Sequence, residues 1–105
     1  MNWAIRELLR MAEDMTPQAE MKFVRTEKSS DDAFAEIFRE LSWFVLTVRK
    51  NEGLKAKVTR TDDDSSMTVS IWISEHKARE AVIEKLGDIA SKMASKYEVK
   101  LTKVD

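Results

Sequence analysis

The chain has 105 residues, of which 43% are hydrophobic, and this is enough for one domain with its own core. Its 18 basic and 19 acidic residues leave a formal charge of −1, which argues against a general nucleic-acid coat protein, because such proteins carry a clear excess of Lys and Arg. The absence of cysteine excludes disulfides, thiolate metal sites and a cysteine nucleophile, and it fits a reducing cytosol.

Residues 1–15 are predicted to contain an amphipathic helix, which ends before Pro17 because the residue preceding a proline is pushed out of the helical region. Arg6 and Arg10 interrupt this segment, so it lacks the apolar run of a signal peptide. No stretch of the chain approaches the roughly 18 apolar residues of a membrane span. We therefore expect a cytoplasmic protein that makes no contact with a membrane.

After a predicted strand at 20–27, residues 32–51 form the most ambiguous part of the sequence. Their hydrophobic residues recur at steps of three and four, which predicts one helix ending at a left-handed Gly53. The stretch 43–48, WFVLTV, is instead β-branched and aromatic, which favours a strand that enters a hairpin. The periodicity covers the whole segment, so we favour the helix and keep the strand as the alternative.

Two alternating segments, 54–61 and 67–74, follow and predict an antiparallel pair joined by the polar residues 62–66. In the second of them, MTVSIWIS, the hydrophobic residues occupy every other position. The large aromatic Trp72 falls among the polar positions, and this raises the question of what covers it.

The rest of the chain predicts one more helix and one more strand. Ser74 is expected to cap a helix over 75–95. Gly87 lies inside that helix, where glycine costs about 1 kcal/mol relative to alanine, and close packing would account for it. Residues 97–104 alternate again and predict the final strand.

The whole chain, 1–105, is predicted to be a single domain in which the N-terminal helix 1–15 is appended to an α+β sandwich over 20–105. The order β-α-β-β-α-β favours a ferredoxin-like split βαβ fold with a four-stranded antiparallel sheet and two helices on one face. Right-handed crossovers place the strands that begin near 20 and 67 in the centre.

The sequence offers no constellation for catalysis or metal binding, so we expect a non-enzymatic protein without cofactor, metal or small-molecule substrate. His76 is the only histidine, which rules out a histidine pair. The run Asp62, Asp63 and Asp64 lacks the ligand spacing of an EF-hand, so a solvated turn is the better interpretation.

The outward face of the predicted sheet is the candidate site. It is more basic than the chain as a whole and contains Lys22, Val24, Lys55, Lys57, Thr59, Thr68, Ser70, Trp72, Lys100 and Thr102. A second copy, a partner protein, the N-terminal helix or a nucleic-acid base could cover its tryptophan. The N-terminal helix could alternatively pack on a second stripe of the 32–51 helix, which contains Ala35, Ser42, Trp43 and Leu46.

We therefore expect a small interaction or regulatory module that binds a partner protein or forms a homo-oligomer through this face. The alternative function is single-stranded nucleic-acid binding, for which the binding residues are Trp72, Lys55, Lys57, Lys100 and Lys22. The scarcity of glycine and proline, two and one residues, also resembles an engineered sequence. A designed chain without an evolved function is the third interpretation.

Overall fold

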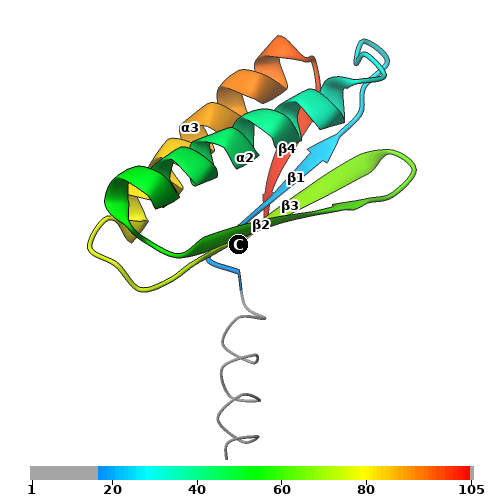
Figure 1. Ribbon diagram of the computed structural model, residues 1–105. Coiled ribbons are helices and arrows are strands. Elements are labelled where there is room, and N and C mark those ends of the chain that lie inside the picture. Colours follow the sequence, from blue (N-terminus) through cyan, green and yellow to red (C-terminus); the bar gives the residue numbers. More distant parts are fainter. Residues whose placement is uncertain (1–16, 105) are drawn as a thin grey trace, which may run out of the picture.

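In the computed structural model, residues 17–104 are described, apart from the side chains at 103 and 104. The elements follow in the order β1 (Ala19–Val24), α2 (Ala33–Glu52), β2 (Ala56–Asp62), β3 (Ser66–Ile73), α3 (Arg79–Lys96) and β4 (Lys100–Val104). The strands form one antiparallel sheet in the order β2-β3-β1-β4, and both helices lie on the same face of it (Figure 1). This is the predicted α+β arrangement, with β1 and β3 in the centre, whereas the predicted helix at 1–15 lies outside the described residues.

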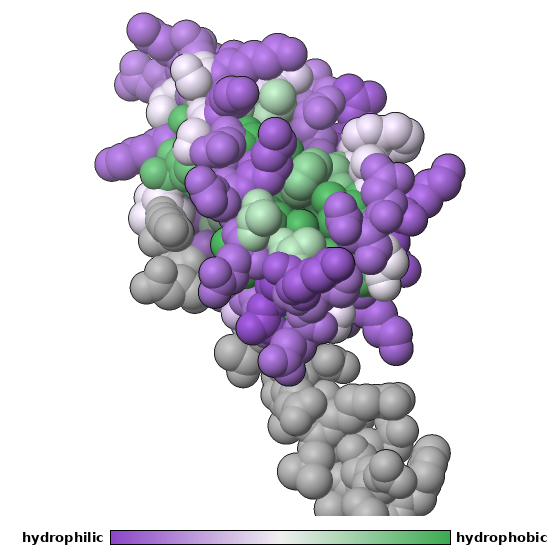
Figure 2. All heavy atoms as spheres, turned by 90° about the vertical axis from the view of Figure 1, so that its left-hand side faces the viewer, coloured by the Kyte–Doolittle hydropathy of each residue, from purple (hydrophilic) through white to green (hydrophobic). Residues whose placement is uncertain are grey.

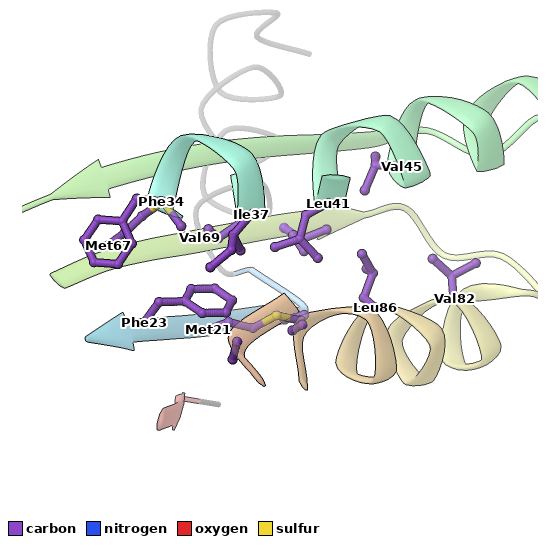
Figure 3. Close-up of a cluster of buried hydrophobic side chains, with 14 of the residues drawn as sticks. Met21, Phe23, Phe34, Ile37, Leu41, Val45, Met67, Val69, Val82 and Leu86 are labelled. Carbon is purple, nitrogen blue, oxygen red and sulfur yellow. The ribbon is translucent and has the colours of Figure 1, made fainter. Parts of the chain in front are cut away.

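The core lies between the sheet and the two helices. Strand β3 contributes its alternate residues to it, since Met67, Val69 and Ile71 are fully buried and the residues between them are not. Phe23 of β1 and Leu86 of α3 are also fully buried, and Figure 3 shows side chains of both helices pointing toward those of the strands. One face of the sheet is therefore sealed by the helices.

Helix α2 covers the whole ambiguous segment, so the strand alternative for 43–48 is wrong. Ile37, Leu41 and Val45 are buried along one side of the helix. Packing of this side in the core stabilises the helical conformation through residues 43–48, although their residue types favour a strand. The helix ends as predicted at Gly53, which has a φ of +69° and donates its N–H to the Arg49 carbonyl oxygen at 3.1 Å.

The start of α3 differs from the prediction. The helix begins at Arg79 and not at residue 75, because Ser74 serves the sheet: its Oγ accepts a hydrogen bond from the Lys55 N–H at 3.2 Å. The residues between Ser74 and Arg79 form an irregular turn, in which the Ala78 N–H donates a hydrogen bond to Nδ1 of His76 at 3.0 Å. His76 is half-buried and supports this turn.

The last strand is shorter than predicted, and the reason is the end of α3. Residues 97–99 close the helix, with the Tyr97 N–H donating to the Met93 carbonyl oxygen and Glu98 in a left-handed conformation of φ +55°. Strand β4 therefore begins at Lys100 and not at residue 97.

Gly87 does not have the predicted role. A Cβ atom built on it meets no described atom within 4 Å, so close packing within this part of the chain does not require glycine there.

Two large hydrophobic side chains of α2 are exposed to solvent, Trp43 by 69% and Leu46 by 54%. They belong to the second stripe of the helix, on which no described residue packs closely enough to bury them. At the end of the molecule where α2 ends and α3 begins, Figure 2 shows hydrophobic residues surrounded by hydrophilic ones.

We predict that Leu41→Ala lowers the free energy of unfolding by about 2–5 kcal/mol, because it removes a fully buried side chain and leaves a cavity. Leu46→Ala is the matched control on the same helix. Since Leu46 is half-exposed, its loss should change stability by about 0.5 kcal/mol or less. Urea denaturation of both variants measures the difference, and equal losses would contradict the position of the core.

Candidate functional site

The candidate site is the face of the sheet that the helices leave uncovered, which we call the open face. Its residues alternate with the core residues along each strand and form rows across the sheet, because directly paired residues point to the same side. The described side chains of the open face that are exposed or half-buried are Glu20, Lys22, Val24, Lys57, Thr59, Thr61, Thr68, Ser70, Trp72, Lys100 and Thr102. Ser66, which pairs with Val24, lies on the same side but is buried. Lys55 continues the alternation just before β2 and is exposed.

Trp72 and Lys57 form the most developed contact of the open face. They are directly paired between β3 and β2, and the Lys57 ammonium lies 5.4 Å from the centroid of the indole ring. This is a cation–π arrangement, worth roughly 0.5–1 kcal/mol at an exposed position. The ring is half-buried, so the sheet itself covers part of it.

The indole N–H of Trp72 is not presented to solvent. Its Nε1 is buried and has no hydrogen-bond partner among the described residues. A binding partner would therefore meet the aromatic surface of this ring and not its donor group. Such a surface suits apolar packing or stacking better than hydrogen bonding.

The open face does not bring all five predicted binding residues together. Lys55 and Lys57 lie beside Trp72. Lys22 instead pairs with Thr68, which lies four residues, or about 13 Å, from Trp72 along β3. Lys100 lies still farther away, on the opposite edge strand β4. The alternation along each strand predicts the face on which a residue lies, but not the residue with which it pairs on the next strand. The separation of the lysines could therefore not be predicted.

Two open-face residues, Glu20 and Thr61, were missed by the sequence interpretation, although the alternation along β1 and β2 extends to both. A third residue, Gln18, acts from the strand end: its Oε1 accepts a hydrogen bond from the Ile73 N–H at 2.7 Å. This bond ties the chain before β1 to the segment of β3 that contains Trp72. Nothing in the hydropathy pattern indicated it.

The turn between β2 and β3 is held by its acidic residues. Arg60 donates two hydrogen bonds of 2.7 Å to the Asp62 carboxylate, and these hold the pKa of Asp62 below its usual value. The pKa of Asp63 is also lowered, first by the Ser66 side chain and then by the backbone N–H groups of Ser65 and Ser66. These two carboxylates thus stabilise the turn through the hydrogen bonds that they accept.

Within residues 17–104, no group of three or more His, Asp or Glu side chains is arranged to hold a metal ion. No helix in that range combines the length and the apolar character needed to cross a membrane. The sequence matches no protein-family model and no curated protein.

We predict that acid weakens the β2–β3 turn. Because folding lowers the pKa of Asp62, its contribution to stability is present above the unfolded pKa and is lost as the pH falls through the folded pKa. Asp62→Asn should therefore reduce stability near pH 7 by about 0.5 kcal/mol or less, as for other exposed ion pairs, and by less at pH 2.5. Urea denaturation at both pH values measures the difference, and a larger cost at pH 2.5 would contradict this interpretation.

Proposed function

We propose that the chain is a cytoplasmic, non-enzymatic interaction module with a ferredoxin-like fold, which binds a second copy of itself or a partner protein through the open face. The observation that supports it is the half-buried Trp72 in a face that neither helix covers. Tryptophan is enriched at the centres of protein interfaces, where its large surface is packed and water is excluded.

The charges of the open face restrict how two copies can meet. With Lys55 included, the open face carries four lysines and one glutamate, Glu20. Two open faces in full register would therefore repel one another. A dimer that overlaps only near Trp72 keeps Lys22 and Lys100 of the two copies apart, but it brings Lys55 and Lys57, which lie beside Trp72, close to the second copy. A partner protein with an acidic surface meets no such restriction.

We predict that Trp72→Ser weakens self-association at least about tenfold, because it removes the aromatic surface from the contact. Trp43→Ser is the matched control, since Trp43 is the more exposed tryptophan but lies on α2, away from the open face. Sedimentation velocity over a range of protein concentrations measures the dissociation constant of each variant. A monomer at every concentration would contradict self-association, and an equal effect of both substitutions would contradict the assignment to the open face.

The alternative function, binding of single-stranded nucleic acid, is favoured by one specific contact. Lys57 already lies over the ring of Trp72, and Lys55 is exposed two positions away. A stacked base would displace the Lys57 ammonium toward a phosphate group. Stacking of this kind contributes about 1–3 kcal/mol per base.

This alternative predicts a change in Trp72 fluorescence when single-stranded RNA or DNA is added at low salt, and a weaker change at moderate salt. The titration is made with a Trp3→Phe, Trp43→Phe variant, in which Trp72 is the only tryptophan. Lys57→Gln in that background should weaken binding, whereas Lys50→Gln, on α2, should not. Unchanged fluorescence at low salt would contradict nucleic-acid binding.

A further inference from the structure

A groove on the helical side of the sheet is separate from the open face. It has a volume of about 630 Å³ and is lined by residues of α3 and of the paired strands β1 and β4. Its apolar residues come from all three elements: Ala19, Met21, Ile83, Ala90 and Leu101. Grooves of this kind, with an apolar floor, are where amphipathic helices dock.

Gly87 makes the groove deeper. It lines the groove from the middle of α3, and the space where its Cβ would stand holds no described atom within 4 Å. Glycine destabilises a helix interior relative to alanine, and no contact among residues 17–104 requires it. The position allows an occupant of the groove to approach the α3 backbone closely.

The rim of the groove is acidic. Glu80, Glu84 and Asp88 follow one another at intervals of four residues along α3. Glu20 of β1 also borders the groove, but its side chain belongs to the open face. No Lys or Arg is among the described lining residues. Lys103 pairs with Met21 in the strand register, so one basic position adjoins the groove, but the three carboxylates of α3 leave an excess of negative charge.

We propose that this groove binds the apolar face of a basic amphipathic helix of a partner protein. The apolar floor would take the hydrophobic stripe of such a helix, and the carboxylates of the rim would meet the Lys or Arg residues that flank it. The proposal concerns a second surface and does not depend on what binds the open face.

Two other occupants fit the charges less well. A second copy that contributed the same groove would bring two acidic rims together. The chain's own residues 1–16 precede Gln18 and Ala19, which line the groove, in the sequence, but they carry three acidic and two basic residues. Both remain outcomes of the experiment below.

The experiment is an NMR titration of the full chain with a synthetic 18-residue peptide of Leu and Lys, with the leucines at helical spacing. We expect amide shifts concentrated in residues 80–91 and 18–21, and affinity that falls at least about tenfold between low and high salt. Gly87→Leu should weaken binding about tenfold or more, because its side chain enters the groove. Lys85→Leu, on a part of α3 that does not line the groove, should leave the affinity within about twofold.

A second variant keeps the test independent of the folding of Gly87→Leu. Glu84→Gln combined with Asp88→Asn should weaken binding about fivefold or more without filling the groove. Equal affinity of this double variant and the wild type, or shifts confined to the open face, would overturn the proposal. If Gly87→Leu moves the amide signals of residues 1–16 before peptide is added, the occupant is the chain's own segment. If Gly87→Leu instead dissociates a dimer, the occupant is a second copy.

Discussion

The alternation of β3 is the constraint on which the rest of the structure depends. This strand pairs with β2 on one side and β1 on the other, and it sends Val69 and Ile71 into the core while Ser70 and Trp72 point away. Because the side-chain period of a strand is two, a register shift of one residue would exchange the two sets and expose the core face. The helices can therefore cover only one face, and the other stays open with its tryptophan.

The near-neutral charge of the chain conceals a separation between its two candidate surfaces. The open face carries Lys22, Lys57 and Lys100 and one glutamate, Glu20. The charged residues that α3 contributes to the groove, Glu80, Glu84 and Asp88, are all acidic. The two surfaces lie on opposite sides of the sheet. The domain therefore presents a positive electrostatic potential on one side and a negative one on the other. Taken together, our two proposals describe a module that connects two different partners.

Periodicity predicted the elements well, because it reflects burial, and predicted their ends and contacts less well. The helix over 32–51 follows from a buried stripe that runs through Ile37 and Leu41 and from a glycine that can end it. The start of α3 could not be deduced, since Ser74 is as good a cap as it is a partner for the Lys55 N–H, and only tertiary structure decides. The groove was missed for a similar reason: it is formed by three elements, and the glycine that opens it resembles a packing residue in the sequence.

The central claim, that β3 has one sealed and one open face, is tested most directly by the reactivity of single cysteines. The chain has no cysteine, so Val69→Cys and Ser70→Cys place single thiols on opposite faces of the same strand. In dilute protein, a thiol reagent should modify the Ser70→Cys variant roughly a hundredfold faster or more, because the Val69→Cys thiol becomes accessible only when the domain opens. Equal rates, or faster modification at position 69, would contradict the account.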